Sequence, residues 1–292
     1  MSARAVRDVG HGLFVLAAGL TQVRRTRGRG PLALASSVGR YGLGFAALGA
    51  LAARRDPGGS ALVDDAGPVT YAGLDRAAGW VAAGIAVPDG RLGVLCRNGR
   101  GFVVALLGAA RTGADVVLLD PGLGAPALRD LLERERVGLV LTDGSCPALA
   151  GPPDGPPVYD VRPVLGAGPG HPPRSPARRA GSVRRVRPGR LVVLTSGTTG
   201  APRGADRGGV RAGQAMPVTT LVSRIPVRPG RPVVLLPPLF HGYGLGFLAV
   251  ALAFGMPAVL TARFDAARTT RLLADHPDAV LVAVPPMLDR IV

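Results

Sequence analysis

From residue 57 onward, short apolar runs alternate with longer segments in which apolar residues recur at helical spacing. The runs predict strands at Ala61–Asp64, Val69–Tyr71, Leu92–Cys96, Val116–Leu119, Gly138–Leu141, Leu191–Leu194, Val233–Leu236, Ala258–Leu260 and Ala279–Val284. The longer segments predict helices at Leu74–Ile85, Gly101–Thr112, Pro126–Arg136, Gly244–Phe254 and Ala266–Asp275. Because strands alternate with helices, the pattern predicts an α/β fold with layered, parallel-rich sheets and flanking helices.

Residues 1–56 form a helical leader with two weakly amphipathic, Arg-flanked stretches, His11–Val23 and Tyr41–Ala53. The first lacks the polarity of a secretory signal, because Asp8 precedes it and arginines follow it. The second has 13 residues and is too short to cross a bilayer. Two interpretations stay open: the leader contacts an anionic membrane surface peripherally, or it packs on the main domain.

The long apolar segment Tyr243–Ala262 resembles a membrane helix only in its length. Gly255, Met256 and Pro257 interrupt it, and this combination ends a helix. We therefore expect a buried helix followed by a buried strand, in a protein of the cytoplasm.

The domain organisation follows from shifts in composition. Residues 57–150 form a first α/β part, residues 151–190 a Pro/Gly/Arg-rich loop or linker, and residues 191–292 a second α/β part. The last segment, Pro286–Val292, has the pattern of the first turns of a helix, so the chain is expected to be cut short at its C-terminus.

Composition and charge exclude some functions. Hydrophobic residues make up 47% and aromatic residues 4% of the chain, which predicts an aliphatic core. The net charge is +16 and all 35 basic residues are arginine, but they are scattered without interleaved aromatic residues, so we expect no nucleic-acid partner. The two cysteines, Cys96 and Cys146, lack metal-ligand spacing, and no metal site is expected.

The most informative motif follows the buried run Leu191–Leu194. It consists of Thr195, Ser196, Gly197, Thr198, Thr199 and Gly200, with Pro202 and Arg203 after them. Glycines allow close backbone approach, backbone N–H groups of such a turn form an anion nest, and hydroxyls donate to phosphate oxygens. Arg203 adds a charged, bidentate donor. The motif therefore predicts a polyphosphate-binding loop, although not a Walker A loop, which needs a lysine.

A rival motif is Gly122–Ala127, which has the form Gly-x-Gly-x-x-Ala after an expected strand and before an expected helix. With Asp143 near the end of the next strand, it imitates a dinucleotide fingerprint. Pro121 precedes the first glycine, and the fingerprint alone is a weak signal. A nicotinamide oxidoreductase is therefore kept as a less favoured alternative.

The segment Thr195–Gly204 resembles the signature Ser/Thr-Ser-Gly-Thr-Thr-Gly-x-Pro-Lys-Gly of the adenylate-forming (AMP-binding) superfamily, with Arg203 in place of the lysine. Other segments resemble further motifs of that superfamily: Thr70–Leu74, Asn98–Asp120, Pro238–Leu245 and Val284–Leu288. Residues 223–226 and the leader are most similar to bacterial fatty-acyl-CoA synthetases.

The resemblance implies a two-step reaction that uses ATP, Mg²⁺ and coenzyme A to convert a carboxylic acid, here a fatty acid, to an acyl-adenylate and then a thioester. It implies that the loop residues hold the ATP phosphates, and that His241, Gly242 and Tyr243 lie in the substrate pocket. It also implies an incomplete N-terminal domain, because the adenine, ribose and lysine motifs are absent from the sequence.

From this we expect the chain alone to be inactive in pyrophosphate exchange, with a complementing C-terminal polypeptide as partner. The alternative is a catalytically inactive relative that binds a nucleotide or a partner protein.

Overall fold

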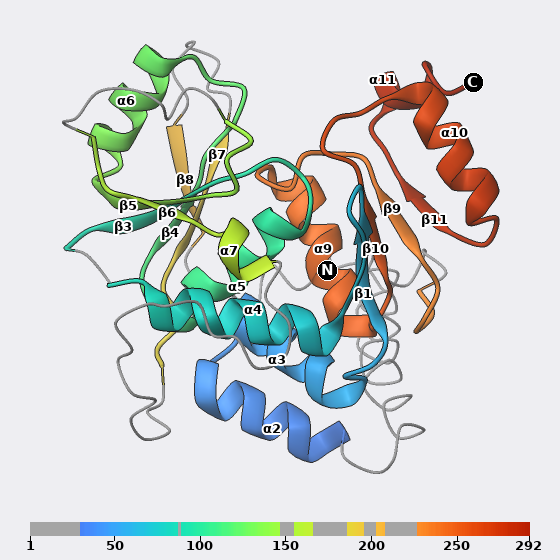
Figure 1. Cartoon of the computed structure of the whole chain (residues 1–292), viewed down its shortest axis with the longest axis horizontal. Helices are drawn as coiled ribbons and strands as arrows, with labels where there is room; N and C mark the ends of the chain where they lie inside the picture. The colour runs from blue at the N-terminus through green and yellow to red at the C-terminus, as the bar shows by residue number, and fades with distance from the viewer. Residues whose placement is uncertain (1–29, 87–88, 147–154, 166–185, 196–202, 208–226) are drawn as a thin grey trace, which may run out of the picture.

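The computed structural model describes residues 30–86, 89–146, 155–165, 186–195, 203–207 and 227–292, and two sheets organise them (Figure 1). The six-stranded sheet has the order β6-β5-β3-β4-β7-β8, and the five-stranded sheet has the order β11-β9-β10-β1-β2. The strands are β1 Ser60–Asp64, β2 Gly67–Thr70, β3 Arg91–Leu95, β4 Val116–Leu118, β5 Val137–Thr142, β6 Val158–Asp160, β7 Leu191–Thr195, β8 Arg203–Arg207, β9 Val233–Leu235, β10 Ala258–Leu260 and β11 Val280–Val282. The helices are α2 Gly30–Tyr41, α3 Phe45–Arg55, α4 Tyr71–Gly84, α5 Arg100–Thr112, α6 Ala125–Arg134, α7 Arg162–Leu165, α9 Gly242–Phe254, α10 Ala266–Asp275 and α11 Pro285–Leu288.

The pairing in both sheets is parallel except at one edge of each, where β8 lies antiparallel to β7 and β2 lies antiparallel to β1. Strands from both expected α/β parts enter each sheet: β1 pairs with β10, and β4 pairs with β7. The layered α/β fold predicted from the sequence is confirmed. Because all the parallel strands of a sheet end at the same edge, the loops that follow them gather there.

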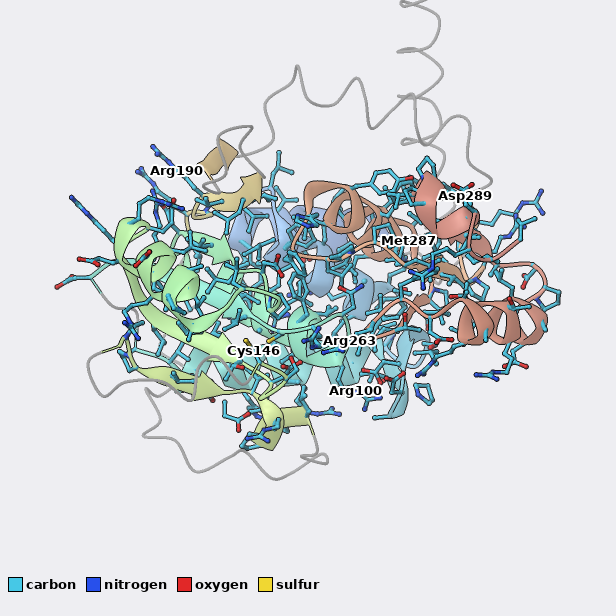
Figure 2. All side chains as sticks on the ribbon, turned by 90° about the horizontal axis from the view of Figure 1, so that it is seen from above. Arg100, Cys146, Arg190, Arg263, Met287 and Asp289 are labelled. Carbon is cyan, nitrogen blue, oxygen red and sulfur yellow. The ribbon has the colours of Figure 1, made fainter. Side chains whose placement is uncertain are left out.

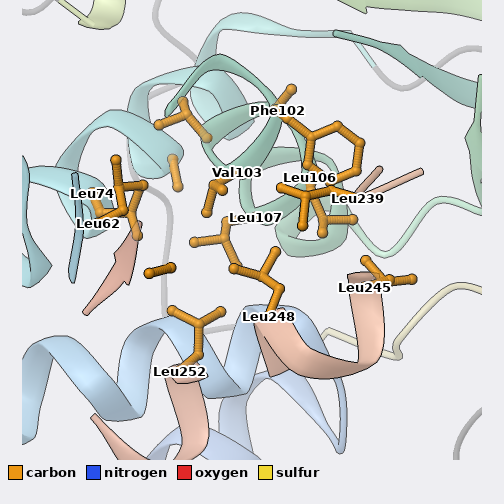
Figure 3. Close-up of a cluster of buried hydrophobic side chains, with 14 of the residues drawn as sticks. Leu62, Leu74, Phe102, Val103, Leu106, Leu107, Leu239, Leu245, Leu248 and Leu252 are labelled. Carbon is orange, nitrogen blue, oxygen red and sulfur yellow. The ribbon is translucent and has the colours of Figure 1, made fainter. Parts of the chain in front are cut away.

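The central layer between the sheets consists of α4, α5 and α9, while α6 and α10 cover the outer faces (Figure 1). Figure 3 shows Phe102, Leu106 and Leu107 of α5 facing Leu248 and Leu252 of α9. All five side chains are buried. Burying one such side chain contributes about 1.5–3 kcal/mol, so this aliphatic layer fixes the spacing of the two sheets.

The described part of the leader packs on this core. The Arg55 Nη1 donates to the carbonyl oxygen of Ala253 at 2.8 Å, which satisfies the C-terminal end of α9. Buried alanines of α3 pack in the same region, as the high alanine content of the helix allows. For residues 30–55 the structure therefore shows packing on the domain. Membrane contact through residues 1–56 stays a prediction, and His11–Val23 lies outside the described residues.

No helix within the described ranges combines the length and the apolar character that crossing a membrane requires. The interruption predicted in Tyr243–Ala262 is confirmed: α9 ends at Phe254, and β10 begins at Ala258. Gly255 takes a left-handed conformation with φ of 70°, as a helix-ending glycine does.

The structure corrects the sequence-based boundaries in three places. Residues 151–190 are not loop throughout, because β6 adds a parallel strand beside β5 and α7 follows it, with Val161 and Val164 buried. The strand expected at Val69–Tyr71 ends at Thr70, whose Oγ1 accepts from the Gly73 N–H at 3.1 Å and caps α4. Strand β8 was not predicted at all.

Candidate functional site

The stems of the predicted phosphate loop are strands β7 and β8. They pair antiparallel, with Thr195 opposite Arg203 at the end of the hairpin that adjoins the loop. The loop residues between them, Ser196, Gly197, Thr198, Thr199 and Gly200, lie outside the described residues. Since β7 is parallel to β4, the hairpin places the start and end of the loop at the carboxyl edge of the six-stranded sheet.

The second predicted group comes after β9, at the start of α9. His241 is the N-cap residue of α9, and its exposed ring lies 4.5 Å from the Phe240 ring. Gly242 begins the helix, and the half-exposed Tyr243 makes an edge-to-face contact with Phe247 at 5.1 Å. The structure thus brings the three predicted pocket residues together at the N-terminus of one helix.

The turn that leads into α9 is tight. A Cβ atom on Gly244 would lie 2.5 Å from the carbonyl oxygen of Pro238, closer than a side chain tolerates. The glycine therefore allows the loop after β9 to fold back against the first turn of α9.

Asn98 is a site residue that sequence reasoning did not single out. Its buried amide donates from Nδ2 to the Pro237 carbonyl at 3.1 Å, and its Oδ1 accepts from the Leu239 N–H at 2.8 Å. Asn98 follows β3 of one sheet, whereas Pro237 and Leu239 follow β9 of the other. One side chain therefore joins the carboxyl ends of both sheets. A polar residue within three positions of the end of a buried strand was the available signal.

An ion pair beside Asn98 reinforces this junction. Arg100 at the start of α5 binds Asp64 at the end of β1, with 2.5 Å between Nη2 and Oδ1, and its backbone N–H donates to Oδ2 at 2.8 Å. Burial acts to raise the pKa of Asp64, but the hydrogen bonds from Arg100 outweigh it and hold this pKa below its usual value. The carboxylate therefore stays ionised while it joins α5 to the five-stranded sheet.

An apolar cavity of about 410 Å³ lies beside α9. One helical face of α9 forms a wall with Gly242, Leu245, Gly246 and Ala249, which follow the spacing of successive turns. The other walls are the α2–α3 corner with Tyr41, Leu43, Gly44, Phe45, Ala46 and Leu48, helix α5 with Leu106 and Ala110, and the β4 and β7 region with Ala114, Val116, Pro188, Gly189, Arg190, Leu191 and Val193. The cavity thus begins next to His241 and extends along the face of β7.

The described residues contain no group of three or more His, Cys, Asp or Glu side chains that could hold a metal ion. We therefore assign no Mg²⁺ ligand. The rival dinucleotide motif corresponds to the short connection between β4 and α6, where Asp120 Oδ1 accepts from the Gly122 N–H at 2.7 Å.

Two parallel-rich sheets around a helical layer, with Thr195 and Arg203 paired at the carboxyl edge of one sheet, define a layered α/β protein. The family model described as AMP-binding enzyme matches residues 50–292. The chain therefore belongs to the AMP-binding enzyme family, and the oxidoreductase alternative is not retained.

Solved structures with the same fold include o-succinylbenzoate CoA synthetase from Bacillus subtilis, with a TM-score of 0.67, 21% identity, and coverage of 84% of this chain and 50% of that one. Another is the N-terminal domain of FACL13 from Mycobacterium tuberculosis, with a TM-score of 0.66 and 23% identity. The match covers 85% of this chain and 64% of that one. The Bacillus subtilis enzyme has also been solved with ATP and magnesium ion. Comparison with curated protein sequences yields no significant match.

The chain thus spans 50% to 64% of the length of these two structures. At such identities the likeness shows the fold, which is that of the N-terminal domain of adenylate-forming enzymes.

Proposed function

We propose that this chain supplies the phosphate-binding and acyl-binding part of an enzyme that activates a carboxylic acid with ATP and transfers the acyl group to coenzyme A, with a fatty acid as the carboxylic substrate. The observation that carries the proposal is the position of the apolar cavity. It starts at Gly242, the residue after His241, and follows β7, the strand that enters the phosphate loop.

The course of the cavity determines which end of a fatty acid lies next to the phosphate loop. Val193 and Leu191 line it below the loop end of β7, and Leu43 and Phe45 lie at its far end in the leader. A carboxylate at the loop end therefore leaves its hydrocarbon tail against the leader. Drug-sized ligands occupy pockets of about 300–1,000 Å³, and each buried CH₂ contributes about 0.8 kcal/mol. A long aliphatic tail gains the most from such walls.

The chemistry has two displacements. A carboxylate oxygen attacks the α-phosphorus of ATP, and the bond to the pyrophosphate oxygen breaks. The coenzyme A thiol then loses its proton, its sulfur attacks the acyl carbonyl, and AMP leaves. The departing pyrophosphate is held by the loop residues Thr195, Ser196, Gly197, Thr198, Thr199, Gly200 and Arg203. At the mouth of the acyl cavity lie His241, Gly242 and Tyr243. Mg²⁺ supplies charge neutralisation on the phosphates.

The alternative is a relative that binds nucleotide without catalysis. The observation in its favour is that Arg203 replaces the lysine of the family's signature loop. A guanidinium keeps the charge of the family's lysine but differs in shape and in its hydrogen-bonding fork. In that case the same two binding regions persist and only the acyl transfer is lost.

Separate binding of the two ligand parts tests the proposal. Calorimetry would titrate the chain with palmitate and, in a second series, with pyrophosphate. Because the cavity walls are apolar and each buried CH₂ contributes about 0.8 kcal/mol, we expect palmitate to bind at least about tenfold more tightly than benzoate, the control for an aromatic acid. Equal affinity for palmitate and benzoate would contradict a fatty-acid cavity, and absence of pyrophosphate binding would contradict the phosphate-binding part.

A further inference from the structure

A second cavity, of about 210 Å³, lies between the carboxyl ends of the two sheets. Arg97 and Asp120 approach it after β3 and β4 of the six-stranded sheet, and Thr261 and Arg263 approach it after β10 of the five-stranded sheet. Figure 2 shows Arg263 between the two halves of the molecule. In open α/β sheets, ligands bind in crevices outside the carboxyl ends of the strands, so the position is that of a ligand site.

The groups that line this cavity are suited to an anion. Arg97 is held in place by Ser145, because its backbone N–H donates to Oγ at 3.1 Å and its Nε donates to the carbonyl oxygen at 3.4 Å. The terminal nitrogens of Arg97 then have no hydrogen-bond or ionic partner in the described part of the chain. Arg263 likewise has none there, and it is exposed at the cavity rim. Two guanidinium groups are thus available to one small space.

A buried hydroxyl supports the same conclusion independently. Thr261 is 4% exposed, and its Oγ1 has no hydrogen-bond partner among the described residues. A buried hydroxyl without a partner is unfavourable, and a ligand oxygen at this position would supply the missing hydrogen bond. Asp120 also lines the cavity, but its Oδ1 already accepts from the Gly122 N–H. The two arginines against one carboxylate leave a net positive charge.

We propose that this cavity is a phosphate-binding site in which Arg97, Thr261 and Arg263 hold one phosphate group. None of the residues that line it belongs to the phosphate loop, and the proposal does not depend on the role proposed for that loop. Arginine forks match phosphate geometry in a bidentate manner, and the hydroxyl adds a third donor. The phosphate is either inorganic or carried by an organic ligand such as a nucleotide or coenzyme, and both share the chemistry that the cavity recognises.

The test is calorimetric titration of the chain with inorganic phosphate, pyrophosphate, ATP and coenzyme A in separate arms. Arg263→Ala and Arg97→Gln each remove one charged donor, so each should weaken at least one of these ligands by about tenfold or more. Arg271→Ala is the matched control, because Arg271 is an exposed arginine of the neighbouring helix α10 that does not line the cavity. Arg203→Ala reports on the phosphate loop in the same titrations.

A loss in both cavity variants with Arg271→Ala unchanged supports the site, and the arm in which it occurs identifies the source of the phosphate. Retained affinity in both cavity variants overturns the proposal. So does an equal loss in Arg271→Ala, which would mean that the overall charge of +16 attracts the anion without a specific site. If Arg203→Ala has no effect while the cavity variants do, the loop assignment fails and this site stands.

Discussion

The cavity beside α9 and the cavity between the carboxyl ends of the two sheets differ in the character of their walls. The cavity beside α9 is lined mostly by glycine, alanine, aliphatic and aromatic residues, with Arg190 as the charged residue among them, whereas the cavity at the carboxyl ends of the sheets contains Arg97, Arg263 and a buried hydroxyl. The difference follows from topology. Strand faces and helix faces are apolar because they form the core, while strand ends are where the chain leaves the core and can carry polar groups. A ligand with a hydrocarbon tail and a charged head would use both kinds of surface.

The largest expected effect comes from removing the Asn98 side chain, which joins the carboxyl ends of the two sheets. Asn98→Leu removes both partners of the Pro237 carbonyl and the Leu239 N–H, which lie in the loop before α9. Two buried polar groups then lack partners, and we expect a loss of about 3 kcal/mol in the free energy of unfolding. Urea denaturation followed by circular dichroism measures it.

The matched control is Asn98→Asp, which keeps the acceptor for Leu239 and loses the donor to Pro237, so its loss should be smaller. If Asn98→Leu unfolds at the same urea concentration as the unaltered chain, the two hydrogen bonds do not hold the sheets together.

A smaller, pH-dependent effect is expected at the Asp64–Arg100 pair. The pKa of Asp64 is lowered in the folded protein from its ordinary 3.8, so its contribution to stability is present above about pH 4 and is lost as the pH falls through the folded value. Asp64→Asn should cost about 2 kcal/mol at pH 7 and remove this part of the acid dependence. Thermal unfolding from pH 7 to pH 2 measures both.

Asp89→Asn alters an exposed carboxylate and serves as the control. An acid dependence that persists unchanged in Asp64→Asn would show that other carboxylates cause it.

The smallest effect is expected at Tyr71, which lines neither cavity. Its buried hydroxyl has no hydrogen-bond partner among the described residues, and burial raises its pKa to about 12 against the opposing charge of Arg55. The folded state therefore keeps stability below pH 10 and loses it as the pH rises toward 12. Tyr71→Phe should gain about 1 kcal/mol at pH 7 and lessen the alkaline loss.

Denaturation at pH 7 and at pH 11 would measure this, with the exposed Tyr243 changed to Phe as control. A Tyr71→Phe protein that is less stable at pH 7 would indicate a partner for the hydroxyl.

Most strands and helices could be predicted because their patterns are local. The spacing of α10 predicts its bounds, Ala266–Asp275, and Gly255 marks the end of α9. Other features depend on distant partners. Strand β6 has three residues next to prolines, and its pairing with β5 makes it a strand. Strand β8 is a polar segment that extends only because β7 lies beside it.

The motifs proposed for the candidate site can be read from the sequence, whereas the contacts that assemble the site cannot. The sequence shows the phosphate-loop motif from Thr195 to Arg203 and the group at His241, but it does not predict that Arg203 begins a strand paired with β7. It does not indicate that Asn98 reaches across to the other sheet, or that Leu43 of the leader closes the apolar cavity, because both contacts join segments far apart in the chain. The packing of α3 on α9 could not be predicted for the same reason, because Arg55 and Ala253 lie far apart in the chain.

The most direct test of the central claim is to fill the apolar cavity. Gly246 lines it, and a Cβ atom there would meet nothing within 4 Å, so Gly246→Phe should fold normally and occupy the space of the acyl tail. Gly39→Phe is the matched control, since this helical glycine of α2 also has open space around it but does not line the cavity. Titration with fatty acids of increasing length should show Gly246→Phe losing at least about tenfold in affinity for palmitate and less for octanoate, with Gly39→Phe unchanged. Palmitate affinity that is the same in all three proteins would contradict the account.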